Sequence, residues 1–278
     1  MKEKVIRIGT CFLGTLGIVD LSCMIVEKCG VEICLSSHVW VCLVLAITAL
    51  WYFIDGKAVS GFLVKQITID LPNLRTSINV FAGDLLAQKG CAIVPANDFF
   101  DNVVNESIVA EKSIDGQMIK RFWAGNLSSM DNDVNDQLKS APFTAVERVL
   151  PAKNKRYAIG TSVVLAARDD LRIIWVALTN TDITTHKTHA NMEDLQLSIR
   201  SALVTARNKG NGDILNIPLM GGGLSRTGLN SSFLLNLLRG LIVDESKKEC
   251  ITETINIVLT KKVIDELNLL EIKRSWEG

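Results

Sequence analysis

The chain has 278 residues and a formal net charge of zero. This length allows one large domain or two small ones, and the balanced charge gives no indication of general nucleic-acid binding. Apolar residues make up 48% of the chain and the mean hydropathy is +0.26, which is high for a soluble enzyme. The excess of apolar residues is concentrated at the N-terminus.

Two apolar runs, 8–26 and 33–54, predict a transmembrane hairpin. The first run contains one charged residue, Asp20, and the second contains none. At about 1.5 Å per residue they reach roughly 28 and 33 Å, which matches a hydrocarbon core of about 30 Å. Two buried core helices are one alternative. A signal peptide is another, and its basic flank would be Lys2, Lys4 and Arg7.

Basic residues near the two runs predict the orientation. Only Lys28 lies in the short connection between the runs, beside two glutamates. The positive-inside rule therefore places both chain termini in the cytoplasm, in a multi-pass protein of the bacterial inner membrane. The basic residues outside the hairpin are Lys2, Lys4 and Arg7 before it and Lys57, Lys65 and Arg75 after it.

Asp20 is an unusual residue for a membrane span, because a carboxylate there is costly and should not face lipid alone. It either lies close enough to the outer surface to reach water or faces a polar path shared by several subunits. Thr10 and Gly14 form a pair of small residues four positions apart, and Gly17 lies on the same face as Asp20. Such small residues favour close approach of helices.

The seven cysteines and three histidines give no metal or redox motif. There is no CxxC pair, and His186 and His189 are not part of an HExxH sequence. We therefore expect no bound metal and no cofactor.

From about residue 64 the sequence is typical of a soluble α/β domain. Strands and helices alternate, which predicts a mixed, largely parallel sheet that is covered on both faces. Ligands of such sheets bind at the carboxyl ends of the strands. The predicted strands are 64–71, 78–81, 91–95, 160–167, 172–178, 213–219 and 254–260, and the predicted helices are 114–123, 130–140, 191–209, 231–243 and a short closing helix.

Residues 217–230, IPLMGGGLSRTGLN, predict a strand, a glycine-rich turn and the start of a helix. Leu229 and Asn230 stand where a P-loop needs Lys and Ser or Thr, so nucleotide triphosphate hydrolysis is rejected. The backbone N–H groups and the helix dipole still favour an anion. A side chain at Gly222 or Gly223 would fill the anion's space, and we expect a positive φ there. The alternative is a tight turn without a ligand.

Two polar residues follow other predicted strands. Asp84 comes directly after the strand that ends in Phe-Ala-Gly, where we expect a helix to start, and Asn97 comes after the strand 91–95. The alternative roles are a helix N-cap for Asp84 and a turn residue for Asn97.

These elements together resemble the macro domain, over roughly residues 67–270. The resemblance implies a three-layer α/β/α domain at 61–278 behind a two-helix transmembrane region at 1–60. It also implies that Asp84 contacts the adenine amino group of an ADP-ribose derivative, that Asn97 lies near the distal ribose and that the glycine loop wraps the pyrophosphate. The full predicted ligand-binding set is Asp84, Leu85, Asn97, Phe100, Ser113, Gln117, Gly221, Gly222, Gly223, Leu224, Ser225, Arg226 and Thr227.

The sequences SIDGQ at 113–117 and GTSVV at 160–164, together with the hairpin, resemble the membrane-anchored macro-domain effectors of the Thoeris anti-phage defence system. The resemblance implies that a partner TIR-domain protein makes an ADP-ribose-derived signal. The effector would bind this signal, assemble into a homo-oligomer and compromise the membrane lipid. It implies no catalytic residue.

Two departures from the general macro-domain pattern favour a sensor over a hydrolase. Residues 98–104, DFFDNVV, stand where hydrolytic macro domains commonly carry a run of glycines. Arg226 stands where a small glycine is usual, and its guanidinium either pairs with the ligand or is a solvated loop residue. A membrane-tethered ADP-ribosyl hydrolase and a membrane scaffold with a degenerate macro fold remain the alternatives.

Overall fold

The computed structural model describes residues 2–28, 37–71, 74–105, 107–149, 151–222 and 228–277. The chain divides into two compact units. The first contains residues 1–65 together with 268–278, and the second contains residues 66–267. The second unit thus begins close to the predicted boundary at residue 61, and the last residues of the chain join the first unit.

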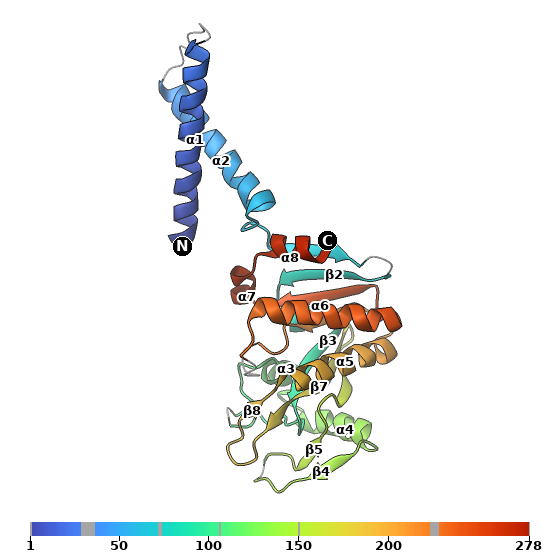
Figure 1. Cartoon of the computed structure of the whole chain (residues 1–278). Coiled ribbons are helices and arrows are strands. Elements are labelled where there is room, and N and C mark those ends of the chain that lie inside the picture. Colours follow the sequence, from blue (N-terminus) through green and yellow to red (C-terminus); the bar gives the residue numbers. More distant parts are fainter. Residues whose placement is uncertain are drawn as a thin grey trace. The chain divides into compact units, whose positions relative to one another are not determined.

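The first unit is built on two long helices, α1 (Lys2–Lys28) and α2 (Ser37–Ile54). α1 contacts α2 (Figure 1), and the buried side chains of the pair include Cys11 and Thr15 on α1 and Val44 and Thr48 on α2. Both threonine hydroxyls donate to carbonyl oxygens of their own helix, at 2.8 Å. The polar atoms in this contact are therefore satisfied within each helix.

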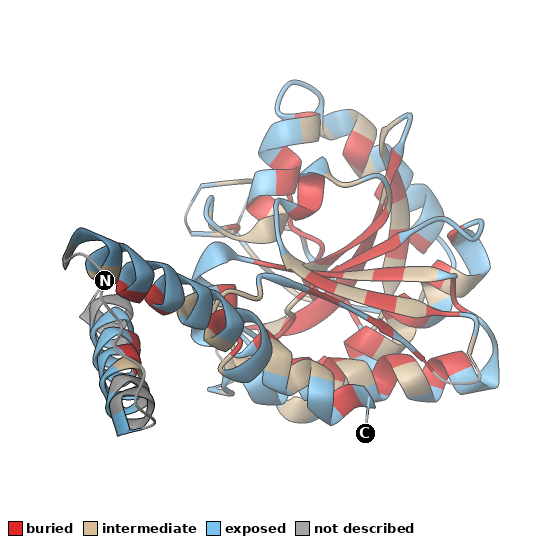
Figure 2. Cartoon of the chain, turned by 90° about the horizontal axis from the view of Figure 1, so that it is seen from above, coloured by how far each residue is buried: buried red, intermediate tan, exposed pale blue. Residues whose placement is uncertain are grey.

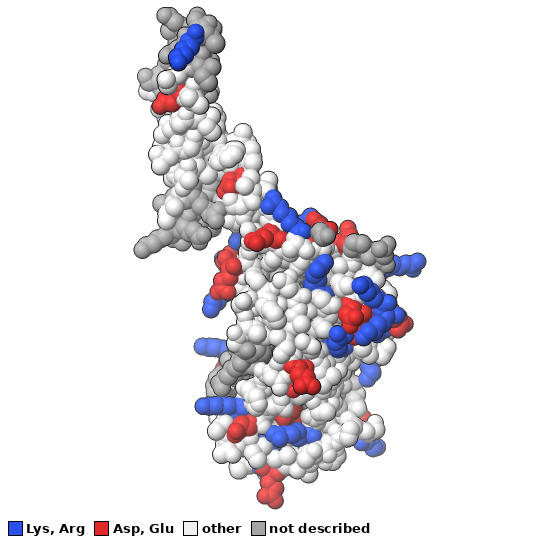
Figure 3. Space-filling view, in the orientation of Figure 1, with Lys and Arg blue, Asp and Glu red and all other residues white. Residues whose placement is uncertain are grey.

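Most other apolar residues described on these helices are exposed (Figure 2), and charged side chains are sparse on their described surface (Figure 3). Among the described residues one helical segment, His38–Val59, is long and apolar enough to cross a membrane. The apolar part of the first helix, Ile8–Leu21, is shorter. The second predicted span is thus supported by length and composition, and the hairpin as a whole stays a prediction. Most of the connection between the spans lies outside the described residues.

A π-helical turn (Asp55–Val59) follows α2, and the closing helix α8 (Leu269–Glu277) packs beside the segment after it. Asn268 Nδ2 donates to the Ser60 carbonyl at 3.0 Å, and Arg274 donates to the Ala58 carbonyl. Gly61 has a φ of 74°, and a Cβ there would lie 2.5 Å from Leu270 Cβ. Only glycine fits this approach, which holds the C-terminal helix in the first unit.

The second unit contains a mixed sheet whose five central strands are parallel. The strand order is β1-β2-β10-β9-β3-β7-β6, and the outer strands β1 and β6, with the short β8 beside β7, are antiparallel to their neighbours. The largely parallel sheet expected from the sequence is confirmed. The strands are β1 (Gln66–Asp70), β2 (Ser77–Ala82), β3 (Gly90–Asn97), β6 (Ser162–Arg168), β7 (Leu171–Thr181), β8 (Thr188–His189), β9 (Leu215–Pro218) and β10 (Thr254–Leu259).

Helices cover the sheet because its central strands are apolar on both faces. On β7, Ile173 and Trp175 join the core cluster under α3 (Ile114–Trp123) and α4 (Leu127–Leu138). The alternate residues Ile174 and Val176 are also buried, and α5 (Met192–Lys209) packs on β7 and against α6 (Ser231–Lys248). Figure 2 shows this buried interior, as expected for a sheet that is covered on both faces.

Three parts of the fold differ from the sequence prediction. β4 (Phe143–Ala145) and β5 (Lys155–Tyr157) form a separate two-stranded hairpin, and the segment between them is called the strap below. The helix expected after Asp84 is only a 3₁₀ turn, η2 (Leu85–Ala87). The helix predicted to close the chain is a pair, α7 (Lys261–Glu266) and α8.

An asparagine ladder crosses three neighbouring strands. Asn79 on β2 donates to Asn256 on β10 at 3.0 Å, and Asn256 donates to Asn216 on β9 at 2.9 Å. Asn216 in turn donates to the carbonyls of Lys89 and Cys91 at 2.8 and 3.1 Å. If the pairing of one strand with its neighbour shifted by one residue, its asparagine would move to the opposite face of the sheet. The ladder therefore favours the observed register.

Replacing Asn216 by Ala should lower the free energy of unfolding by about 1–3 kcal/mol, because buried partners lose their hydrogen bonds. Urea denaturation of the full chain in detergent would measure this. The matched control is Thr68→Ala, because Thr68 donates to Asn79 at the exposed end of the ladder. Equal losses for the two variants would contradict a special role for the buried end.

Candidate functional site

The carboxyl ends of the parallel strands bring together the three features expected from the sequence. Asp84 follows β2, Asn97 ends β3 and the glycine turn follows β9. Since β2, β10, β9 and β3 are joined by parallel pairing, these ends lie at one edge of the sheet. Ligands of open α/β sheets bind at this edge.

Asp84 has two partners. Its Oδ1 accepts from the backbone N–H of Leu86 at 2.9 Å, so it caps η2, as the alternative reading of the sequence had it. Its Oδ2 accepts from Arg121 Nη1 of α3 at 2.7 Å. Both side chains are half-exposed, 55% for Asp84 and 41% for Arg121. The carboxylate therefore remains open to a further donor.

A groove of about 560 Å³ lies between η2 and α3. The predicted ligand residue Gln117 lines it and donates from Nε2 to the Lys112 carbonyl at 3.0 Å. Leu85, also predicted, is buried, and its neighbour Leu86 lines the groove instead. The full lining is Leu86, Glu111, Lys112, Gln117, Lys120 and Arg121.

Ser113 begins α3 as its N-cap. Its hydroxyl accepts from the Gly116 N–H at 3.1 Å and lies 2.5 Å from the Ala110 carbonyl. Asp115, which contacts the same hydroxyl, accepts from the Gly116 N–H at 2.9 Å. Burial raises the pKa of Asp115 to about 6. The predicted ligand contact of Ser113 thus competes with a capping role that already uses its oxygen.

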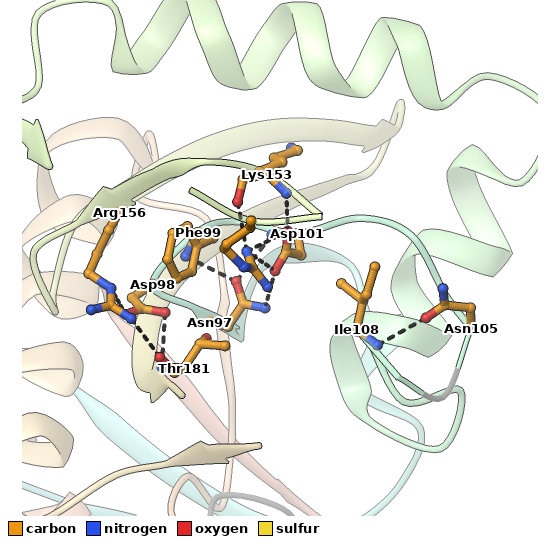
Figure 4. Close-up of polar contacts among 10 residues, drawn as sticks. Asn97, Asp98, Phe99, Asp101, Asn105, Ile108, Lys153, Arg156 and Thr181 are labelled. Atoms are coloured by element: carbon orange, nitrogen blue, oxygen red, sulfur yellow. Dashed lines mark hydrogen bonds and ion pairs between the residues drawn. The ribbon is translucent and has the colours of Figure 1, made fainter. Parts of the chain in front are cut away.

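Asn97 is buried and turned into its own loop (Figure 4). Its Oδ1 accepts from the backbone N–H groups of Phe99 and Asp101, both at 3.1 Å, and its Nδ2 donates to Asp101 Oδ2 at 3.1 Å. This is the turn role that the sequence left open. In this arrangement the amide holds the loop after β3, and its predicted contact with a ribose has no support.

Phe100 requires a correction. It was expected to line the ligand site, but its side chain is fully buried. Its ring makes edge-to-face contacts with the rings of Tyr157 and Trp175, at centroid distances of 5.8 and 5.1 Å. The turn closed by Asn97 gives Phe100 a φ of 52° and directs the ring into the core. Phe100 therefore packs the domain and does not line an accessible surface.

A buried ion pair fastens the strap to this loop. Arg148 Nη1 donates to Asp101 at 2.9 and 3.2 Å and to the Lys153 carbonyl at 2.8 Å. The Lys153 N–H donates to Asp101 Oδ1 at 2.8 Å. The two charged side chains are 0% and 1% exposed. Each charged side chain needs the other as its partner, because an unpaired buried charge strongly destabilises the fold.

Phe99 lies between two arginines. The guanidinium carbons of Arg148 and Arg156 lie 4.0 and 4.9 Å from its ring centroid, within range of cation–π attraction. Arg156 Nε is 2.9 Å from Asp98 Oδ2, and Asp98 accepts from the Thr181 N–H at 3.1 Å. Burial raises the pKa of Asp98. The aromatic pair after Asn97 is thus fixed in place on both sides.

The glycine turn shows which glycine is required. Gly221 has a φ of 86°, and a Cβ there would lie 2.9 Å from Leu195 and 3.0 Å from Leu234. Gly222 is exposed, and a Cβ there would meet no atom closer than 3.6 Å. We expected a positive φ at Gly222 or Gly223. Among the described glycines of the turn it occurs at Gly221, where the chain passes between two helices, and Gly223 lies outside the described residues.

Five predicted residues of the loop lie outside the described residues, namely Gly223, Leu224, Ser225, Arg226 and Thr227. The described chain resumes before α6, whose cap Asn230 accepts from the Phe233 N–H at 2.8 Å. The N-terminus of this long helix follows the glycine turn in the chain, and helix N-termini favour anions. Within the described residues, no group of three or more Asp, Glu, His or Cys side chains could hold a metal ion.

The structure adds Arg121 and Arg148, which the sequence analysis missed. Arg121 is four residues after Gln117, so the helical spacing places both on one face of α3. That spacing was a usable signal once α3 had been predicted. Arg148 lies in a strap without a sequence pattern, so nothing in the sequence indicated its pairing with Asp101.

Replacing Arg148 by Met should lower the free energy of unfolding by about 3–5 kcal/mol, because Asp101 is left buried without its countercharge. Chemical denaturation measures the loss. The double variant Arg148→Met with Asp101→Asn should recover a large part of it. If the double variant is as unstable as the sum of both single variants, the two side chains are not coupled.

Comparison with solved structures identifies the fold. The Oceanobacillus iheyensis macrodomain with ADP matches with a TM-score of 0.51 at 13% identity, over 76% of this chain and 97% of that chain. A mutant of the same macrodomain matches with a TM-score of 0.53 at 12% identity, over 77% and 99%. At these identities the likeness concerns the fold alone.

Comparison of sequences identifies the family. The Thoeris protein ThsA of Bacillus amyloliquefaciens (strain Y2) is 24% identical over 172 residues, which are 59% of this chain and 54% of that protein. The match therefore spans about half the length of this relative. The family described as Thoeris protein ThsA, Macro domain, matches residues 78–260. Because that match covers more than half of the chain, the chain belongs to the Thoeris ThsA macro-domain family.

Proposed function

We propose that this chain is a membrane effector of anti-phage defence whose macro domain binds an ADP-ribose-derived signal. The observation that carries the proposal is the half-exposed Asp84 beside the groove, at the same sheet edge as the glycine turn. A carboxylate suits an exocyclic amino group, and a glycine turn before a helix suits a phosphate. Family membership and the shared fold support the same ligand class.

The proposal includes a place for the chain in a signalling sequence. A TIR-domain partner makes the nucleotide, the macro domain binds it, and the chains assemble and disrupt the inner membrane. The apolar segment His38–Val59 supports the membrane part. The proposed hairpin and the positive-inside rule place both termini in the cytoplasm. Gly14 and Gly17 on α1 support assembly, because apart from the neighbouring backbone of α1 no described atom lies within 4 Å of a Cβ built at either position. That surface is open to another helix.

A sensor is favoured over a hydrolase by the loop after β3. Its amide Asn97 is engaged with Asp101, and Phe99 and Phe100 fill the space that follows. A rigid, bulky loop of this kind leaves little room to position a water molecule at a ribose. The fate of the ligand discriminates the two functions. A sensor returns ADP-ribose or its derivative intact after binding, whereas a hydrolase consumes an ADP-ribosylated substrate.

Calorimetry of the full chain in detergent with ADP-ribose tests the proposal. Asp84→Ala should weaken binding by about tenfold or more, since losing a polar contact typically costs ~1–3 kcal/mol. The control is Asp70→Ala. Asp70 ends β1 and accepts from Ser77, which begins β2, at an exposed position on the opposite edge of the sheet from the site. Unchanged affinity in folded Asp84→Ala would remove this carboxylate from the site.

The link from binding to membrane damage is proposed to pass through Asp20. It lies in a groove of about 500 Å³ between α1 and α2 and is the one charged residue among the described residues that line it. Clustered subunits would bring several such carboxylates towards a shared polar path. The other lining residues are Phe12, Leu16, Val19, Trp40, Val41, Val44 and Leu45.

Asp20→Leu should therefore leave nucleotide affinity unchanged and abolish ligand-triggered dye release from liposomes. Leu13→Ala, at an exposed apolar position of the same helix, is the control and should keep dye release. Full dye release from Asp20→Leu would show that this carboxylate only reaches water at the outer surface.

A further inference from the structure

The chain passes between the two compact units at two junctions, at residues 65–66 and 267–268. The first junction leads into β1, an outer strand of the sheet. The second follows α7, which comes directly after the central strand β10. A second junction restricts the motion that a single flexible junction would allow, because it closes a loop of chain.

The second junction starts beside the candidate ligand site. The carbonyl of Leu259, at the end of β10, accepts from the Gly83 N–H at 3.0 Å, and Gly83 directly precedes Asp84. α7 begins two residues after Leu259, and two residues separate its end from α8. A displacement at the end of β10 would therefore reach α8 over a short stretch of chain.

α8 holds residues 58–61, which follow the membrane helix α2. Two hydrogen bonds and one close approach make this contact, and we call them the clasp. They are the bond from Asn268 to the Ser60 carbonyl at 3.0 Å, the bond from Arg274 to the Ala58 carbonyl, and the approach of Leu270 to Gly61.

The segment held by the clasp is itself tied to the end of α2. The Ser60 N–H donates to the Asp55 carbonyl at 2.7 Å, and the Ser60 hydroxyl donates to Asp55 Oδ1 at 2.5 Å. The Leu63 N–H donates to the Gly56 carbonyl at 2.9 Å, and a Cβ at Gly56 would lie 2.5 Å from Leu63. A force on residues 58–61 therefore acts on the end of α2.

Completion of the macro fold does not explain α8. A helix with that role would belong to the second unit, whereas α8 belongs to the first. Its apolar residues Leu269 and Trp276 are buried, so it is anchored more firmly than an ordinary chain end. Arg274 donates out of the helix to the segment after α2.

We infer that α8 couples nucleotide binding in the macro domain to the membrane helices through the clasp. The inference rests on the proposed function and goes beyond it, because it assigns the transmission step to the last residues of the chain. Binding at the sheet edge displaces the end of β10, and α7 and α8 carry the displacement to the segment after α2. The clasp, closed or open, is the two-state element that such coupling requires.

The test uses the full chain in liposomes, with ADP-ribose as the probe. The double variant Asn268→Asp with Arg274→Met removes both hydrogen bonds of the clasp, and Asn268→Asp keeps an oxygen to cap α8 at the Glu271 N–H. Calorimetry should give the affinity of the unchanged protein. Dye release with ADP-ribose should fall by about tenfold or more, the shift expected when two hydrogen bonds are lost.

The matched control is Lys273→Met. Lys273 is a cation of the same helix, but it pairs with Glu277 of that helix. This variant should keep both the affinity and the full dye release.

Gly61→Leu opens the clasp in a second way, because a side chain there would meet Leu270 and Asn268. Its control is Gly212→Leu. Gly212 has a φ of 72°, and apart from its neighbours in the chain no described atom lies within 4 Å of a Cβ there. Both variants carry the backbone strain of a positive φ, so only Gly61→Leu should lose dye release. Flotation of the liposomes checks that each variant is inserted, and thermal unfolding checks that it is folded.

Hydrogen exchange gives a readout that does not depend on membrane damage. In the unchanged chain in detergent, ADP-ribose should change the exchange rates of the Ser60, Leu63 and Val64 N–H groups, which bond within this segment. The double variant should lose this response. A helix that only stabilised the first unit would alter these rates without ADP-ribose and would give no response to the probe.

The inference is overturned, while the proposed function stands, if both open-clasp variants release dye as fully as the unchanged protein. The same holds if ADP-ribose leaves the exchange of these N–H groups unaltered. Dye release from the open-clasp variants without ADP-ribose would also contradict it, because α8 would then restrain the membrane helices. If the unchanged protein binds no ADP-ribose or releases no dye with it, the proposed function itself fails, and the inference fails with it.

Discussion

The burial of β3 and β7 on both faces is the constraint on which the rest of the domain depends. Ile93 and Trp175 have no exposed surface, and the strands pair in parallel. Parallel strands end at a common edge, so the chain can only place its loops there. The candidate ligand site and the glycine turn both follow strands that end at this edge, and the strap is fastened to the loop after β3. Apolar packing thus determines where the polar groups meet.

The loop after β3 shows how polar groups fix what apolar packing leaves undetermined. Asp101 accepts from Asn97, Arg148 and the Lys153 backbone, so three segments of the loop and strap converge on one carboxylate. Its burial ties Asp101 to Arg148, since loss of either charged side chain would leave the other unpaired in the interior. The bulky residues that distinguish this loop are thereby held rigid, which fits ligand binding better than ligand turnover.

The two units differ in how far they bury their apolar side chains. The macro domain buries its apolar side chains in one interior, whereas α1 and α2 expose most of theirs and contact each other through small and β-branched residues. A surface of this kind is costly in water and stable against lipid. The same chain therefore joins a macro domain to helices suited to an apolar solvent. The proposed effector function, in which nucleotide binding acts on a membrane, requires both.

The sequence by itself determined the order of strands and helices, the parallel core and the meeting of Asp84, Asn97 and the glycine turn at one edge. These features depend on local periodicity and on strand ends, which a sequence displays directly. The direction of individual side chains was decided by tertiary structure. Asn97 and Phe100 point inwards because Asn97 bonds to Asp101 and Phe100 packs in the core. Gly221 rather than Gly222 is the position that requires glycine, because its φ is positive and a Cβ there would clash with Leu195 and Leu234. Arg121 and Arg148 acquire their partners across 37 and 47 residues of chain, and contacts at such separation leave no local pattern.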